Sequence, residues 1–129
     1  MMKEFENNAY FWQKVDTLYS SGDFKLTNKK GSIHKMYPSL NYPCDFGYVR
    51  TLNSDNETPM EVFKTPQGKR VDAIVLCADI INKRFEVKAL VGVNDEECEE
   101  ILRFLNCTDY QKSVLLKRGK IIPAWADTE

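Results

Sequence analysis

The sequence predicts an α+β fold in which a small, mostly antiparallel sheet or barrel carries two helices. Two segments place apolar residues at helical spacing, whereas several shorter segments alternate or run apolar as strands do. Glycine, proline and other turn-forming residues separate these segments. The chain has 129 residues, a length that favours one domain, so we expect residues 1–129 to share one sizeable core.

The expected helices cover residues 9–20 and 94–106. In the first, AYFWQKVDTLYS, one face carries apolar and aromatic side chains, namely Phe11, Trp12, Val15, Leu18 and Tyr19. The second begins after Asn94, and Glu97 stands three residues later, which is the spacing of a capping box. Both segments are therefore expected to pack an apolar face against the sheet.

The expected strands are short and are bounded by polar or turn-forming residues. The strongest signal is the segment VDAIVLCA, which is apolar over almost its whole length. A turn with two lysines, NKKGS, and a polar loop, NSDNETP, separate the earlier strands. The predicted strands cover residues 23–27, 46–52, 60–64, 71–78, 85–93 and 114–118.

Composition excludes several classes of protein. A net charge of −1 provides no field for nucleic acid, and the chain has no run of about 18 apolar residues, so we expect neither a nucleic-acid nor a membrane partner. The first residues, MMKEFENNAY, lack an apolar signal core, which favours a cytoplasmic protein. Four cysteines without a C-x-x-C motif are expected to be reduced and buried. A single histidine, His34, excludes any site that needs two.

Three groups of charged residues could carry chemistry. One is acidic, one mixes carboxylates with a lysine on two long strands, and one is a basic turn followed by a histidine. If the sheet brings them together, carboxylates and lysines would line one cavity, as a magnesium-assisted phosphate site requires. The three groups are Asp55, Glu57 and Glu61; Asp72, Asp79, Glu86 and Lys88; and Lys29, Lys30 and His34.

Each group also has an ordinary structural explanation. Turn chemistry alone selects Asp, Asn and Glu in a polar loop. Glu86 and Lys88 lie two residues apart on one strand face, where an exposed cross-strand ion pair explains them equally well. His34 alone is a common surface residue, and the aromatic residues of YPCDFGY, 42–48, are typical of a core strand.

One segment favours the functional interpretation. Residues 30–49, KGSIHKMYPSLNYPCDFGYV, resemble the family I soluble inorganic pyrophosphatases, whose short bacterial relatives carry K-G-S-x-H and then Y-P-x-[ND]-Y-G-Y. Weaker similarity continues in the same order to residue 118. The resemblance implies a five-stranded antiparallel β-barrel of the pyrophosphatase type, with an N-terminal helix and a helix near the C-terminus. It also implies Mg²⁺-dependent hydrolysis of pyrophosphate or a related phosphoanhydride, with Mn²⁺ as the alternative ion.

The same resemblance assigns roles to individual residues. It implies metal ligands at Asp55, Glu61, Asp79 and Glu86. It implies that Asp55, Glu61 and Lys88 act in catalysis. It implies substrate contacts from Lys29, Lys30, His34, Phe46 and Lys88.

The chain departs from the family pattern at several of these positions. Phe46 stands where the family has a phosphate-binding tyrosine, and Asn56 and Thr58 stand at two metal-binding aspartate positions. Glu61 and Glu86 replace aspartates, which moves each carboxylate outward by one methylene. Two functions therefore remain open: metal-dependent hydrolysis of pyrophosphate or a related phosphoanhydride, or a catalytically inactive relative that binds an anion, a nucleotide or a protein partner. A third function, an oligonucleotide-binding barrel, requires a basic groove that a net charge of −1 does not indicate. The sequence leaves a homo-oligomer open as well.

Overall fold

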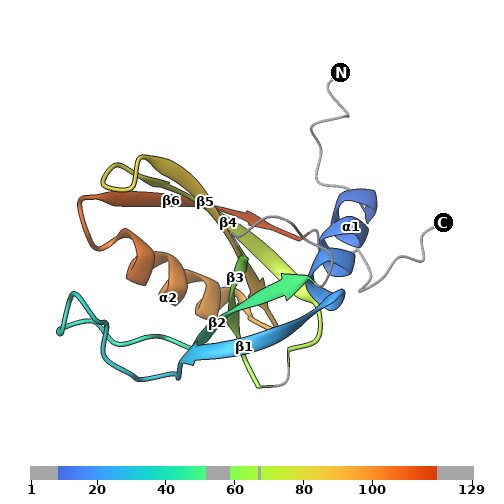
Figure 1. The fold of residues 1–129 in the computed structure, drawn as a ribbon, viewed down its shortest axis with the longest axis horizontal. Helices are drawn as coiled ribbons and strands as arrows, with labels where there is room; N and C mark the ends of the chain where they lie inside the picture. Colours follow the sequence, from blue (N-terminus) through green and yellow to red (C-terminus); the bar gives the residue numbers. More distant parts are fainter. Residues whose placement is uncertain (1–8, 52–58, 67, 119–129) are drawn as a thin grey trace.

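The computed structural model describes residues 9–51, 59–66 and 68–118, which form two helices and six strands (Figure 1). No helix within these ranges is long and apolar enough to cross a membrane. The helices are α1 Ala9–Ser20 and α2 Asp95–Asn106. The strands are β1 Gly22–Asn28, β2 Asp45–Thr51, β3 Met60–Lys64, β4 Val71–Asp79, β5 Arg84–Val91 and β6 Gln111–Lys117.

The α+β class is confirmed, but the expected five-stranded antiparallel barrel is not what forms. The described strands make one sheet in the order β1-β2-β3-β5-β4-β6, with β1 and β6 at opposite edges. Strands β3 and β5 run parallel, whereas the other neighbours are antiparallel. Alternation along a strand specifies which face each side chain takes, but it does not specify which strands become neighbours. The sheet is therefore mixed and open.

The two helices cover opposite faces of the sheet. Phe63 and Leu90 point into a core that also contains Ile101 and Leu105 of α2. Their chain neighbours Val62 and Ala89 point the other way, into a core that contains Trp12 and Val15 of α1. This separation follows from the period of two along a strand. The central strands are consequently buried on both faces where the helices cover them, whereas Leu76 of β4 and Phe85 and Val87 of β5 stay exposed.

Helix α2 begins as the sequence predicts. Asn94 accepts a hydrogen bond from the backbone N–H of Glu97 at 2.8 Å, and the Glu97 carboxylate accepts one from the backbone N–H of Asn94 at 2.9 Å. These two bonds form the capping box, which satisfies backbone donors that the first helical turn leaves unpaired. Residues Cys98, Ile101 and Leu105 are buried against the sheet.

The segment between β1 and β2 is held by its own backbone hydrogen bonds. Gly31 N–H donates to the Tyr42 carbonyl at 2.8 Å, and Tyr42 N–H donates to the Ser32 carbonyl at 2.9 Å. His34 N–H donates to the Leu40 carbonyl at 2.8 Å. These bonds position the aromatic side chains of this segment beside the sheet and α2, where they form one wall of a cavity.

Candidate functional site

A cavity of about 210 Å³ brings together four charged residues that are distant in the sequence. Glu61 comes from β3, Glu86 and Lys88 come from β5, and Asp79 ends β4. All four were singled out in the sequence, and all four line this cavity. Three carboxylates and one ammonium give it an acidic character.

The ion pairs in this cavity follow from strand register. Glu61 and Lys88 are direct partners across the parallel pair β3–β5, and Glu86 lies two residues before Lys88 on the same face. The Lys88 ammonium contacts Glu61 Oε1 and lies 3.2 Å from Glu86 Oε1. Arg84 Nη2 lies 2.8 Å from the other oxygen of Glu86. The carboxylates of Glu61 and Glu86 thus converge on one buried ammonium.

This network determines the charge of its members. Burial opposes the charged form of Lys88, but the charge and hydrogen bond of Glu61 and the charge of Glu86 raise its pKa above the ordinary value. Burial likewise opposes ionisation of Glu86, but the charge of Lys88 and hydrogen bonds from Arg84 and Lys88 lower its pKa. Lys88 therefore stays protonated, and Glu86 stays ionised, at neutral pH.

Asp79 lines the cavity, but its oxygens are engaged in the turn that follows β4. Oδ1 accepts hydrogen bonds from the backbone N–H groups of Ile81 and Asn82, each at 2.9 Å. Oδ2 accepts one from Asn82 Nδ2, also at 2.9 Å. The backbone bond from Asn82 is the largest cause of a lowered pKa at Asp79. The carboxylate thus stabilises the β4–β5 turn.

Aromatic rings form the opposite wall of the cavity. Phe46 is half-buried, and its ring centroid lies 4.7 Å from that of Phe63 and 5.6 Å from that of Tyr42. Tyr42 in turn contacts Phe104 of α2 at 4.9 Å. The Lys88 ammonium lies 5.9 Å from the Phe46 ring centroid, at the outer limit of a cation–π contact. The segment YPCDFGY is therefore both core and cavity wall.

His34 also lines the cavity, and its imidazole stabilises a turn. Nδ1 accepts hydrogen bonds from the backbone N–H groups of Met36 at 3.0 Å and Tyr37 at 3.2 Å. Because Nδ1 is an acceptor, the ring proton belongs on Nε2. The ring stacks on Tyr42 with centroids 5.8 Å apart.

Sequence reasoning missed the residues at the end of the cavity formed by the α2–β6 connection. Thr108, Tyr110 and Gln111 line it there, and Arg84 supports Glu86 from β5. Burial is the main cause of a raised pKa at Tyr110. Arg84 could have been found, since it alternates with Glu86 and Lys88 along one strand face. Nothing in the local sequence marks Thr108 or Tyr110.

The remaining candidate residues lie elsewhere in the fold or outside the described residues. Lys29 and Lys30 are exposed on the turn before Gly31. Neither is among the described residues that line this cavity. Asp55 lies outside the described residues. Asp72 lies at a different cavity, where it accepts from Val93 N–H at 3.1 Å and from Arg70 Nε at 2.9 Å.

The carboxylate pair can also be approached from a second side. A further cavity of about 700 Å³ is lined by Phe46, Glu61 and Glu86 together with Arg84 and Phe85. The Glu61 side chain keeps 38% of its surface exposed, whereas that of Lys88 keeps 7%. A ligand could therefore reach Glu61 without a rearrangement of the backbone.

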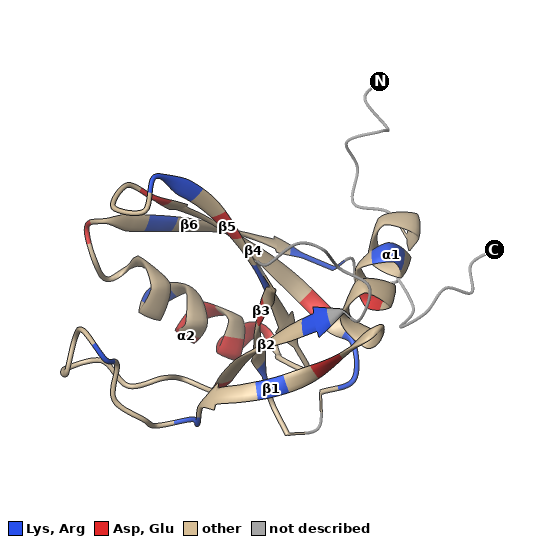
Figure 2. Ribbon diagram, viewed as in Figure 1, with Lys and Arg blue, Asp and Glu red and all other residues tan. Residues whose placement is uncertain are grey.

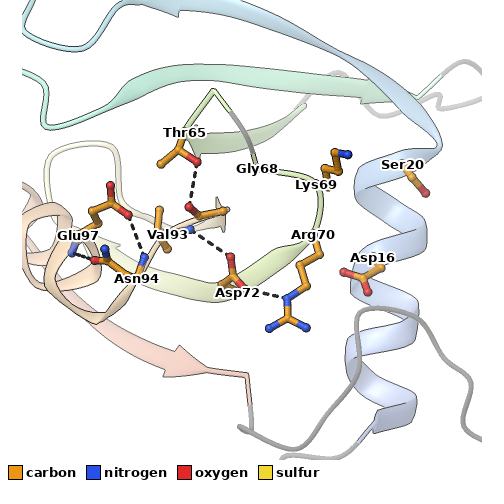
Figure 3. Close-up of a pocket in the computed structure, with 11 residues that line it drawn as sticks. Asp16, Ser20, Thr65, Gly68, Lys69, Arg70, Asp72, Val93, Asn94 and Glu97 are labelled. Atoms are coloured by element: carbon orange, nitrogen blue, oxygen red, sulfur yellow. Dashed lines mark hydrogen bonds and ion pairs between the residues drawn. The ribbon is translucent and has the colours of Figure 1, made fainter.

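Another cavity, of about 780 Å³, is lined by residues outside this network; Figure 3 shows it. It is bordered by α1, the β3–β4 connection and the start of α2, and its polar groups are engaged in structural bonds. Asp72 bonds Arg70 and Val93, Thr65 Oγ1 donates to the Gly92 carbonyl at 2.8 Å, and the capping box forms its far edge. Figure 2 shows acidic residues in the first half of α2 and charges of both signs along the strands.

The donor set of the smaller cavity suits a hard divalent cation. Mg²⁺ in phosphate-processing sites is commonly held by one or two carboxylates together with substrate phosphates and water. Glu61 and Glu86 are two such carboxylates, and they already converge on a positive charge. They fit a single ion. In the part of the chain that the structure describes, His, Cys, Asp and Glu side chains do not gather into a metal-binding group of three or more.

Comparison with known proteins identifies similar solved structures. An inorganic pyrophosphatase from Coxiella burnetii has 17% identity and a TM-score of 0.47 over 75% of this chain and 77% of that chain. One from Helicobacter pylori has 12% identity and a TM-score of 0.47, covering 77% of this chain and 76% of that one. An inorganic phosphatase from Anaplasma phagocytophilum has 12% identity and a TM-score of 0.46, covering 75% of each.

Neither a protein-family model nor a curated protein matches the chain. At identities below 25% and TM-scores below 0.5, the structural likenesses carry no information about activity.

Proposed function

We propose that the chain is a divalent-metal-dependent hydrolase of inorganic pyrophosphate or a related phosphoanhydride. The observation that supports this proposal is the convergence of Glu61 and Glu86 on the ammonium of Lys88 inside one cavity. Carboxylates, a buried lysine and polar hydroxyls are the groups that phosphoryl transfer uses for positioning and charge neutralisation.

Glu61 and Glu86 would hold a Mg²⁺ or Mn²⁺ ion, and Asp79 would keep the start of β5, which carries Glu86, in place through the β4–β5 turn. The ion would supply positive charge that offsets the charge of the phosphate groups. Lys88 keeps its proton because its pKa is raised, so its ammonium can turn from the carboxylates to a phosphate oxygen. This exchange would keep each charged group paired.

The aromatic wall would orient the substrate and keep bulk solvent away from it, while the water that attacks phosphorus enters the site. Burial, reinforced by the charge of Glu61, raises the pKa of Tyr42. Its hydroxyl therefore keeps the proton and can donate a hydrogen bond to a phosphate oxygen. Phe46 supplies apolar surface beside Lys88, which strengthens the electrostatic interactions of that ammonium.

The test is phosphate release from pyrophosphate with Mg²⁺, with Mn²⁺ and with chelator. We expect turnover with either ion and none with chelator. Glu61→Gln removes a charge at the convergence point and should lower kcat/KM by about 100-fold, a loss that active-site misplacement commonly causes. Glu100→Gln is the matched control, because Glu100 is an exposed carboxylate on α2. Equal activity of the two variants would contradict the assignment.

A readout without catalysis tests the same ligands. Because a ligand bound only to the folded state stabilises it, Mn²⁺ should raise the Tm of the unmodified chain. The increase should be smaller for Glu61→Gln and Glu86→Gln and unchanged for Glu100→Gln. Mn²⁺ is chosen because Mg²⁺ demands near-ideal octahedral geometry.

The engagement of Asp79 favours a second candidate, an inactive relative that binds an anion, a nucleotide or a protein partner. Both Asp79 oxygens already accept hydrogen bonds from the turn, so one of the implied metal ligands is committed to structure. This candidate predicts no turnover with any divalent ion, but a rise in Tm with phosphate or pyrophosphate. Turnover that depends on Glu61 would exclude it.

A further inference from the structure

The hydroxyl of Thr108 is a buried polar group of this cavity that the described residues leave without a hydrogen bond. Thr108 lies in the connection between α2 and β6 and lines the same cavity as Glu61, Glu86 and Lys88. Its Oγ1 is buried and has no hydrogen-bond partner in the described part of the chain. Buried polar groups of this kind are rare in folded proteins, because leaving one unpaired costs free energy.

The usual local partners of this hydroxyl bond other donors, and Thr108 Oγ1 bonds none of them. A threonine after a helix commonly bonds a carbonyl of the preceding turn. Here the Phe104 carbonyl accepts from Cys107 Sγ at 3.3 Å, and the Leu105 carbonyl accepts from Gln111 Nε2 at 3.0 Å. The Asn106 carbonyl accepts from Lys112 Nζ at 2.9 Å. The hydroxyl bonds none of these carbonyls, so a rotation of the Thr108 side chain would let it pair with a molecule bound in the cavity that this residue lines.

The backbone that carries Thr108 is well held. Ile80 N–H, in the β4–β5 turn, donates to the Tyr110 carbonyl at 2.9 Å. The Tyr110 ring stacks on Tyr37 with centroids 6.2 Å apart. These contacts tie the connection to the turn that Asp79 stabilises. The backbone beside Thr108 thus has a defined position, as the support of a preorganised binding group should have.

We propose that Thr108 Oγ1 donates a hydrogen bond to a phosphate oxygen of the substrate and is a substrate-binding residue. This inference rests on the proposed function. A phosphate group has acceptor oxygens on all sides, so it can accept from the Lys88 ammonium and from the Thr108 hydroxyl in one cavity. The ligand class is a phosphate or a phosphoanhydride, for which the cavity provides both an ammonium and a neutral donor.

The test compares Thr108→Val with Thr108→Ser. Valine has the shape of threonine without the hydroxyl, whereas serine keeps the hydroxyl. Because valine removes an unpaired buried polar atom, Thr108→Val should keep or raise the Tm. Its KM for pyrophosphate should rise, and kcat/KM should fall, by about tenfold or more, since it loses a hydrogen bond to a charged group. Thr108→Ser should stay near the parent in kcat/KM.

Thr17→Val provides the matched control, because Thr17 is exposed on α1 and bonds its own helix. We expect it to leave kcat/KM unchanged. A fall in Tm of Thr108→Val with parental kcat/KM would overturn the inference and assign Thr108 a structural role, while the proposed function would stand. If the parent chain neither turns over pyrophosphate nor gains Tm with pyrophosphate or phosphate, the proposed function fails and the inference fails with it.

The inference can also be tested if the parent chain shows no turnover but inorganic phosphate raises its Tm. In that case the increase in Tm at a given phosphate concentration should be smaller for Thr108→Val than for the parent. For Thr108→Ser the increase should equal that of the parent. Equal gains for Thr108→Val and the parent would overturn the inference.

Discussion

Glu61 on β3 and Lys88 on β5 are partners across the one parallel strand pair of the described sheet, and their side chains form an ion pair within the cavity. They lie 27 residues apart in the sequence. Glu86 contacts the same ammonium at 3.2 Å. Removing this one positive charge would leave two carboxylates close together and partly buried, so Lys88 is central to both the stability and the chemistry of the cavity.

Lys88→Met should lower the free energy of unfolding by about 1–3 kcal/mol at pH 7, the usual cost of leaving a charged group without its partner. The partial exposure of Glu61 limits the loss. Loss of the Lys88 charge raises the pKa of Glu86 in the variant, so its folded state takes up a proton and the deficit should shrink towards pH 4. Urea unfolding at both pH values measures this. Lys25→Met, an exposed lysine of β1, is the control; a deficit that does not depend on pH would argue against charge repulsion.

Glu86 should contribute to stability only when it is ionised. Its folded-state pKa is lowered from the ordinary 4.5, mainly by the charge of Lys88 acting against burial. A lowered carboxylate pKa contributes stability above the ordinary value, and this contribution is lost as the pH falls from 4.5 through the folded-state value. The free energy of unfolding, measured with urea between pH 6 and pH 3, should therefore fall less steeply with decreasing pH for Glu86→Gln than for the parent. Identical slopes would show that the ion pair adds nothing.

The buried pair of Asp16 and Arg118 should stabilise the contact of α1 with the sheet. Arg118 Nη2 lies 2.7 Å from Asp16 Oδ2, and Nη1 donates to Oδ1 at 3.0 Å and to the Val71 carbonyl at 2.6 Å. Arg118→Met leaves Asp16 buried and should cost about 3–5 kcal/mol. The double variant Asp16→Leu/Arg118→Met should cost less than the sum of the two single changes. Additive losses in urea unfolding would refute this coupling.

Gly92 should tolerate alanine poorly because of both its backbone and its surroundings. Its φ is +72°, and a Cβ there would come within 2.2 Å of Gly68 Cα. Gly31 has a φ of +87°, but an added Cβ would meet nothing within 4 Å among the described atoms. Gly31→Ala should therefore cost only the backbone term, about 1–2 kcal/mol, and Gly92→Ala clearly more. Equal losses of Tm for the two variants would mean that the segments that carry Gly68 and Gly92 move apart without cost.

Local patterns in the sequence predicted the elements well. Strand β3 matches the expected residues 60–64, and the capping box at Asn94 was evident from spacing alone. Strand β6 begins at Gln111, whereas the sequence predicted a start at residue 114. The prediction missed the first residues because they are polar and give no strand signal. Ser113 is nevertheless buried, and its hydroxyl donates to Cys77 Sγ at 2.9 Å.

Neighbouring residues along the chain specify most of the helices and strands and the side chains that share a face, because capping and the periods of 3.6 and 2 are local properties. The position of β5 between β3 and β4 depends on tertiary contacts, since pairing of distant strands is not encoded in spacing. That placement brings Lys88 between Glu61 and Glu86. It also commits Asp79 to a turn and leaves the buried Thr108 hydroxyl without a partner among the described residues, because hydrogen-bond partners are set by three-dimensional proximity.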